Sequence, residues 1–532
     1  MHFIGSATSA LGQVGVVTGI VVVTWHPADA SRLQRALRLT NEAFAETLGA
    51  AARTVAKWHA NPSMALTLEM QAALDTLLSR ASPEAQQRFE QLGAAGHLGR
   101  STEADVRRVS ELLSDARHLH TSLTWLDEVR DAPSGTTFGA VVTRAVRGQV
   151  EEPACAPSER PDRQALSRFL LDYYSHGDEI RGAIFLDTCA ERLRTSLVTP
   201  DRGALSTARG IDARFELTRA PASAAPEATD ALITAAEARL AACLSGRTRF
   251  VDQPTYRLLR CDTGAHGIRA AFGLSTFVRY GLTFDLLEAE AVGGVGSNAV
   301  RLELRDQLLP TLNTVLDPGS RECVGGALAL TAFARPAQGG RPADFLLLVQ
   351  ERSSRVVNGA GRIAVIPKCF HQPTNEPPAE VDIRTTLLRE LEEELFGRAE
   401  VDGTGDTCRL AEVLHPSRMT APMTWLVDSA NLDIRLTGFA YNLVAGSFEF
   451  PAVIAVQDET FWSEFGGCVE ANWESSGLWR ISSADADGIE QLLHDPRWSD
   501  EGLIAFALGL KQLAETNPDR VRLPDFEIGV TP

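Results

Sequence analysis

The sequence lacks the features that mark membrane, exported and zinc-binding proteins. Its eight cysteines lie far apart, with no CxxC pair and no zinc-like spacing, which fits a protein of the reducing cytoplasm. The apolar stretch GVVTGIVVVTW (15–25) is shorter than the roughly 20 residues that a transmembrane helix needs. It also lacks the basic region with which a signal peptide begins. We therefore expect no membrane association and interpret residues 1–30 as an N-terminal extension.

Positive charge is also in deficit. The 532 residues include 51 Lys and Arg against 69 Asp and Glu, which gives a net charge of −18. Because nucleic-acid backbones attract basic surfaces, the chain as a whole is not built to bind a polyanion, and any contact with nucleic acid must be local. Hydrophobic residues make up 44% of the chain, as in ordinary soluble globular proteins, and the length predicts several domains.

Glycine motifs that bind phosphates are missing as well. The stretch AVGGVGSNAVRLELR (291–305) contains a glycine cluster, but it has no GK[ST] sequence and no GxGxxG in the required frame. It is therefore neither a P-loop nor a dinucleotide fingerprint. We predict a flexible turn there.

Patterns of periodicity divide most of the chain. Helical spacing predominates over residues 81–205, apart from a Pro- and Glu-rich break at 150–162 that is a candidate linker. Strand and helix patterns mix over residues 206–317, an α+β region to which no role is assigned. The sequence thus predicts a multidomain protein of α and α/β character.

Residues 31–80 show a pattern of short helices with a local excess of positive charge. Between residues 31 and 62 there are five Lys or Arg and only two acidic residues. Thr40 or Asn41 can cap a helix that ends at Gly49, and another helix follows. Two helices joined by a tight glycine-containing turn form a helix-turn-helix.

The run LTNEAFAETLGAAARTVAKWHANP (39–62) resembles the helix-turn-helix of the XRE/Cro-like DNA-binding family. In that family the third helix enters the major groove of DNA. By position, the resemblance implies that Arg53, Ala56 and Lys57 face the groove and that Asn41 touches a backbone phosphate. Alanines offer bases few hydrogen bonds, which favours weak sequence specificity. An ordinary helical cap without DNA contact is the alternative interpretation.

A second unusual stretch is LLRELEEELFG (387–397). On a helix its leucines share one side, while three glutamates share another arc, namely Glu390, Glu393 and Glu394, with Glu392 outside it. Carboxylates at this spacing repel one another by about 0.2 to 0.5 kcal/mol per pair, so something must compensate. One explanation is a solvated face that nearby arginines neutralise. The other is a hard divalent cation such as Mg²⁺, which prefers carboxylate oxygens and phosphates.

The strands on both sides of this helix, together with RELEEELFG, resemble the Nudix hydrolase family over roughly residues 321–516. The resemblance implies a Nudix-like α/β/α sandwich with a mixed sheet over 318–520. It also implies that Arg389 orients a cluster of carboxylates. These carboxylates would hold Mg²⁺ or Mn²⁺ against the diphosphate of a nucleoside diphosphate derivative, and they are Glu390, Glu393 and Glu394.

The sequence departs from the family signature before the helix. The first Glu of the signature would stand at Val381 and its Gly at Asn375, whereas Glu380 and Asp382 flank the expected position of the Glu. A shifted loop would bring either carboxylate to the metal. Otherwise the site would bind its ligand without hydrolysing it.

Further candidates for the chemistry lie around the helix. Hydrolysis would need a general base, for which three later acidic residues qualify: Glu449, Asp458 and Glu459. Lys368 and His371 stand near the helix entrance and are candidates for phosphate contacts, although ordinary loop roles explain them equally well. The tryptophans are expected in the core rather than stacked on a base, namely Trp462, Trp473 and Trp479.

Two functions follow from these patterns. The first is a cytoplasmic DNA-binding transcriptional regulator, compatible with a homodimer, whose C-terminal domain binds a nucleotide-derived small molecule with a divalent metal. Ligand binding would then shift the placement or the dimerisation of the DNA-binding domains. The alternative is a Nudix pyrophosphohydrolase that uses its N-terminal domain only for recruitment.

Overall fold

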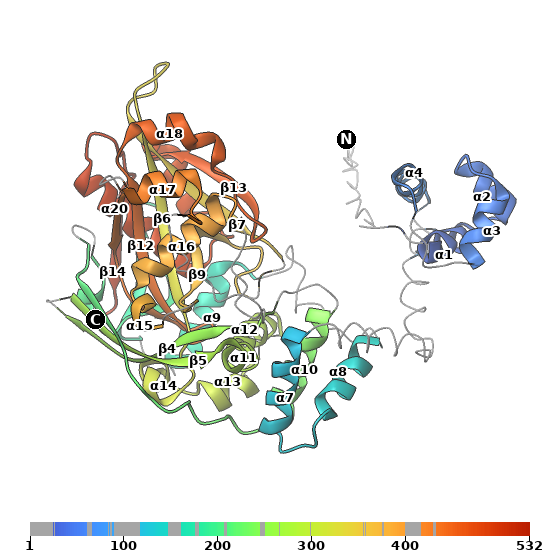
Figure 1. Ribbon diagram of the computed structural model, residues 1–532, viewed down its shortest axis with the longest axis horizontal. Helices are drawn as coiled ribbons and strands as arrows, with labels where there is room; N and C mark the ends of the chain where they lie inside the picture. The colour runs from blue at the N-terminus through green and yellow to red at the C-terminus, as the bar shows by residue number, and fades with distance from the viewer. Residues whose placement is uncertain are drawn as a thin grey trace, which may run out of the picture. The chain divides into compact units, whose positions relative to one another are not determined.

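The computed structural model divides the chain into two compact units, Met1–Thr102 and Glu103–Pro532 (Figure 1). The structure describes residues 25, 27–60, 66–82, 85, 88–89, 117–146, 161–175, 180–206, 210–244, 250–264, 267–297, 299–354, 356, 358–374, 377–398, 417–428 and 432–532. Most of the predicted N-terminal extension (1–24 and 26), most of the predicted linker, and Asn375 lie outside the described residues. No described helix is both long and apolar enough to span a membrane.

The first unit is helical, as the sequence predicts. It contains α1 (Pro27–Leu37), α2 (Asn41–Thr47), α3 (Ala52–Ala60) and α4 (Leu68–Ser79). The first helix starts earlier than the predicted boundary at residue 31, because Pro27 begins the helix and is tolerated in its first turn.

Local signals in the first unit act as expected. The side chain of Thr40, rather than that of Asn41, caps α2 by accepting a hydrogen bond from the backbone N–H of Ala43 at 3.2 Å. Gly49 follows α2 with a φ of 65°, a conformation that favours glycine. Apolar side chains from these helices form one separate core that includes Phe44 and Trp58.

A large mixed sheet dominates the second unit. Its main path is β13-β7-β6-β12-β11-β2-β1-β14, and β6 pairs with β12 in parallel. These strands are β1 (Ala183–Thr188), β2 (Arg192–Val198), β6 (Gly326–Arg335), β7 (Asp344–Arg352), β11 (Ala440–Asn442), β12 (Phe448–Val456), β13 (Ser475–Ser482) and β14 (Phe526–Val530). Three shorter strands pair beside this path, namely β8 (Ile363–Val365), β9 (Lys368–Phe370) and β10 (Leu432–Leu436). The expected α/β character and mixed sheet are confirmed.

Helices cover both faces of this sheet (Figure 1). On one face lie α16 (Ile383–Leu395), α17 (Ala421–Asp428) and α18 (Glu459–Phe465), and on the other lies α20 (Asp500–Thr516), with α19 (Ala486–Leu493) before it. Successive side chains of β6 pack alternately into the cores on the two faces of the sheet. Ala329 belongs to the core that contains Leu391 of α16, whereas Leu330 belongs to the core that contains Phe506 of α20. A strand buried on both sides needs mostly apolar residues, which explains the sequence GALALTAFA, and its one polar side chain, Thr331, donates to the carbonyl of Ile366 at 2.7 Å.

A second, smaller sheet of order β3-β5-β4 packs with helices in the middle of the chain. Its strands are β3 (Ala213–Leu217), β4 (Pro254–Gly264) and β5 (Gly267–Thr276). The helices are α7 (Arg117–Val129), α8 (Thr136–Val146), α9 (Arg163–Ser175), α10 (Asp230–Leu244), α11 (Phe277–Gly281), α12 (Leu286–Ser297), α13 (Glu303–Leu308) and α14 (Leu312–Leu316). One continuous hydrophobic core runs from α7 to Val469, so the boundaries predicted at 205 and 317 fall inside a single unit.

Two predictions for this middle part are wrong. Residues 183–198 do not continue the helical region, because they form β1 and β2, and β1 pairs with β14 near the end of the chain. A partner so distant in sequence leaves no local signal. The glycine cluster around residue 293 is not a turn but part of α12, where Gly294 packs so closely that an added Cβ would lie 2.8 Å from Leu302.

Candidate functional site

The acidic helix α16 begins and packs through its own side chains. Asp382 caps it by accepting a hydrogen bond from the backbone N–H of Arg384 at 2.8 Å. Leu387, Leu391 and Leu395 are fully buried against the sheet. Asp382, one of two carboxylates considered as substitutes for the signature Glu, is therefore engaged at the helix start.

The other such carboxylate is engaged as well. Glu380 accepts hydrogen bonds from the backbone N–H of Thr374 at 2.6 Å and from its hydroxyl at 2.8 Å. These contacts tie it to the loop before α16.

Arg389 organises the cavity side of α16. Its guanidinium donates to Glu390 at 2.6 Å and to the backbone carbonyl of Gln372 at 2.8 Å. Burial lowers the pKa of Arg389, but Glu390 and Glu393 raise it by more, so the guanidinium stays charged. Arg389 thus connects one carboxylate of α16 to the loop that precedes the helix.

The four glutamates of α16 have different surroundings. Glu390 and Glu393 line a cavity of about 160 Å³. Glu394 is buried and accepts hydrogen bonds from the backbone N–H of Lys368 at 2.9 Å and from the amide of Gln350 at 3.2 Å. Glu392, fully buried elsewhere, pairs with Arg398 and accepts from the backbone N–H of Thr420 at 2.6 Å. The solvated-face interpretation is therefore wrong, because three of the four are at most 5% exposed.

Close backbone packing shapes the floor of this cavity. Gly325 and Gly326 line it at the start of β6. A Cβ added at Gly325 would lie 2.0 Å from the carbonyl oxygen of Phe448, and one at Gly326 would lie 1.7 Å from that of Cys369. Only glycine permits the strands to approach so closely at this point.

Basic side chains alternate with acidic ones around the cavity. Arg352 lies 3.5 Å from Glu474, and Lys368 donates to Glu501 at 2.5 Å. Three basic side chains therefore line the cavity, namely Arg352, Lys368 and Arg389. Sequence reasoning missed Arg352, Glu474 and Glu501, because they come from separate elements and carry no shared motif.

Of the three acidic residues considered as a general base, Glu449 on β12 is the one that lines the cavity. It accepts a hydrogen bond from the hydroxyl of Ser447 at 2.8 Å. Burial, and then the neighbouring Glu501, raise the pKa of Glu449 to about 8. Asp458 instead caps α18, and Glu459 pairs with Arg520.

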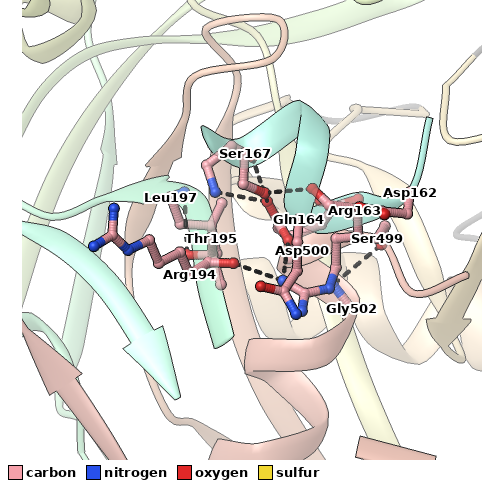
Figure 2. Close-up of polar contacts among 12 residues, drawn as sticks. Asp162, Arg163, Gln164, Ser167, Arg194, Thr195, Leu197, Ser499, Asp500 and Gly502 are labelled. Atoms are coloured by element: carbon pink, nitrogen blue, oxygen red, sulfur yellow. Dashed lines mark hydrogen bonds and ion pairs between the residues drawn. The ribbon is translucent and has the colours of Figure 1, made fainter. Parts of the chain in front are cut away.

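The first turn of α20 joins the cavity to the rest of the sheet. Asp500 accepts from Arg163 at 2.9 Å and from Ser167 at 2.6 Å, which holds α9 in place (Figure 2). It also accepts from the backbone N–H of Ser196 on β2 at 2.6 Å. The next residue, Glu501, turns the other way and holds Lys368. Asp500 thus connects α20 to α9 and β2, and Glu501 connects α20 to Lys368 of the cavity.

The remaining candidates divide between cavity and core. His371 is fully buried: its Nε2 donates to the carbonyl of Val381 at 3.1 Å, so in the neutral ring Nδ1 accepts from Thr386 at 2.8 Å. It does not line the cavity. Trp473 does, contrary to the expected core role. Trp462 packs on Phe333, with 5.8 Å between ring centroids, and Arg497 lies over the ring of Trp479.

In the described part of the chain, no group of three or more His, Cys, Asp or Glu is arranged to hold a metal ion. Carboxylates of Glu390, Glu393, Glu449 and Glu474 reach one cavity, and hard cations prefer such oxygen donors. Burial raises the pKa of Glu394 well above its usual value, and Glu474 and Glu390 raise it further.

The predicted DNA-binding residues lie on the first unit. Arg53, Ala56 and Lys57 are exposed on α3 at a spacing that places them on one side of the helix. Asn41 is half-buried at the start of α2, where its carbonyl oxygen accepts from the amide of Gln34 at 2.8 Å.

Comparison with known proteins adds no relative from which a role for these residues could be transferred. No protein-family model matches the chain, and no curated protein shows significant similarity to it.

Proposed function

We propose that this protein is a DNA-binding transcriptional regulator whose second unit binds a nucleoside diphosphate derivative together with Mg²⁺ or Mn²⁺. The observation that carries the proposal is the charge arrangement of one cavity. Glu390, Glu393 and Glu474 supply oxygen donors there, and Arg352 and Arg389 supply cations. A diphosphate with its metal carries both kinds of charge in a small volume, so both kinds of partner are needed.

Each residue has a distinct part in this proposal. Glu390 and Glu393 would hold the cation, and Arg389 orients Glu390 through their ion pair of 2.6 Å. Lys368 and Arg352 would face the phosphate oxygens. When bound, the cation would neutralise the diphosphate charge and orient it. Glu394 supports the site from behind, since it holds the backbone of Lys368.

The first unit supports the DNA-binding half of the proposal. Its helices α2 and α3 are joined by a tight turn at Gly49, and α3 exposes Arg53 and Lys57. This arrangement agrees with a helix-turn-helix whose third helix lies in the major groove. Ligand-dependent dimerisation would connect the two activities.

One observation favours hydrolysis as a second candidate function. Glu449 shares the cavity with Glu390 and Glu393, and its raised pKa lets it exchange a proton near neutral pH. In a Nudix-like pyrophosphohydrolase, the deprotonated fraction of Glu449, which grows as the pH rises toward 8, would accept the proton of the attacking water. Binding and hydrolysis would then use one site.

The decisive experiment compares Glu393→Gln with Glu392→Gln in Mg²⁺-dependent binding and product release, using a panel of nucleoside diphosphate derivatives. Both substitutions lie on α16 and remove one carboxylate, but Glu392 does not line the cavity and instead contacts Thr420 and Arg398. We expect Glu393→Gln to weaken Mg²⁺-dependent binding at least tenfold and Glu392→Gln to change it less than twofold, a difference of about 1 kcal/mol or more.

The same assay separates the two functions. Product release by the wild type that Glu449→Gln abolishes would establish the hydrolase, whereas Mg²⁺-dependent binding without product release would leave the regulator. The metal-diphosphate proposal is abandoned if Glu393→Gln binds every member of the panel as the wild type does.

A further inference from the structure

The cavity is not built by the acidic helix and its neighbouring strands alone. Val251, Gln253 and Phe277 also line it, and they come from the α+β region that precedes α16 by more than a hundred residues. The same region has no chemical motif of its own. Its position at the cavity is therefore the first indication of what it does.

We call Val251, Gln253 and Phe277 the wall of the cavity. Residues that follow Gln253 in the chain bond to the segment before α16. The backbone N–H of Tyr256 donates to the carbonyl of His371 at 3.0 Å, and its hydroxyl donates to the carbonyl of Pro377 at 2.6 Å. The rings of Tyr256 and His371 lie 4.2 Å apart. Leu258 adds a backbone hydrogen bond to Cys323 at 2.9 Å. The wall is thus fixed relative to the charged residues, as a recognition surface must be.

An aromatic pair contributes to the lining of this part of the cavity. Phe277 and Phe370 both line it, with ring centroids 5.2 Å apart in an edge-to-face arrangement. The backbone N–H of Phe277 donates to the carbonyl of Gln253 at 2.8 Å, which fixes the two residues relative to each other. A flat aromatic ligand can pack on such a surface with favourable geometry.

The wall also presents a hydrogen-bonding group. The side-chain amide of Gln253 is partly exposed at the cavity and makes no hydrogen bond to any described residue. An amide offers both donors and an acceptor, as the edge of a nucleobase does. By contrast, the charged residues of the cavity come from β7, β9, α16 and β12 and from Glu474.

We propose that the α+β region supplies the nucleobase-recognition wall of the site, with Gln253 reading the base edge and Phe277 packing on the base. The diphosphate then lies toward Arg352 and Lys368. This inference rests on the proposed function and deepens it, because it assigns recognition of the base to residues outside the acidic helix and its strands.

The test uses two kinds of non-hydrolysable probe on the full-length protein with Mg²⁺. One is methylenediphosphonate, and the other is the set of α,β-methylene analogues of adenosine, guanosine, cytidine and uridine diphosphate. We expect at least one nucleotide analogue to bind the wild type about tenfold or more tightly than methylenediphosphonate, since base stacking alone contributes on that order.

The variants are Gln253→Ala and Phe277→Leu, with Phe250→Leu as a matched control. Phe250 is buried 5.3 Å from Phe277, between ring centroids, but it does not line the cavity. We expect Gln253→Ala and Phe277→Leu each to weaken the preferred nucleotide analogue about five- to tenfold and to leave methylenediphosphonate unchanged. Phe250→Leu should leave both unchanged.

The outcomes distinguish the two proposals. If methylenediphosphonate binds but no nucleotide analogue binds more tightly, the nucleobase wall is refuted and the diphosphate site stands. Nucleotide affinity that survives both Gln253→Ala and Phe277→Leu refutes it too, as does an equal loss for both kinds of probe. If neither kind of probe binds the wild type, both proposals fall.

Discussion

At the scale of single residues, burial is the largest cause of the pKa shifts of two titratable side chains near α16. Burial shifts the pKa values of Glu449 and His371 in opposite directions. Burial raises the pKa of Glu449 to about 8 and lowers the pKa of His371 to about 3, because in each case it disfavours the charged form. Near neutral pH both side chains are mostly uncharged, although Glu449 titrates just above it.

His371 should make the protein sensitive to acid. Between its ordinary pKa near 6.5 and its folded-state pKa of about 3, the unfolded chain binds a proton that the folded chain does not. The free energy of unfolding therefore falls with decreasing pH in this window, by up to about 1.4 kcal/mol per pH unit from this group. Chemical denaturation of the wild type and of His371→Gln should show a shallower decline in the variant. Equal slopes would contradict the prediction.

At the scale of elements, the same residue type has opposite roles in two helices. A Cβ added at Gly293 in α12 would have nothing within 4 Å, whereas a Cβ at Gly509 in α20 would lie 2.9 Å from the Cβ of Leu330 on β6. Helix propensity favours alanine at both positions. Packing opposes it only at Gly509.

We therefore expect Gly293→Ala and Gly509→Ala to change stability in opposite directions. Gly293→Ala should raise the free energy of unfolding by about 0.5 to 1 kcal/mol, the usual propensity gain. Gly509→Ala should lower it by about 1 kcal/mol, because overpacking costs about 1 to 3 kcal/mol and exceeds that gain. Paired urea denaturation curves would measure both. A higher free energy of unfolding for Gly509→Ala would contradict the prediction, because it would mean that α20 can move away from Leu330 without loss of stability.

At the scale of the whole molecule, an acidic chain carries a locally basic helical unit. The net charge is −18, yet α3 exposes Arg53 and Lys57. Under the proposed function, attraction to DNA would come from the exposed cations of α3, because phosphate binding releases counterions only where cations meet the backbone.

The proposed DNA contact predicts a change in salt dependence. Arg53→Ala and Lys57→Ala should each weaken binding to duplex DNA and reduce the slope of log affinity against log salt by about one unit. Arg80→Ala is the control, since Arg80 is an exposed arginine at the end of α4, outside α3. Fluorescence anisotropy across a salt series would measure the slopes. Unaltered slopes in both α3 variants would remove DNA from the proposed function.

The sequence by itself determined the elements that depend on local patterns. Leucine spacing specifies α16, and Thr40 and Gly49 delimit α2. These features follow from neighbouring residues, whose periodicity and capping chemistry are present in the sequence.

Only the tertiary structure decided which residues meet. The pairing of β1 with β14 and the approach of Gln253 and Phe277 to α16 join segments far apart in the chain. Sequence periodicity cannot specify such contacts, because they depend on how separate elements pack. For the same reason the helix pattern grouped Glu390, Glu393 and Glu394, but it could not show that the backbone of Lys368 occupies Glu394 while the other two face a cavity.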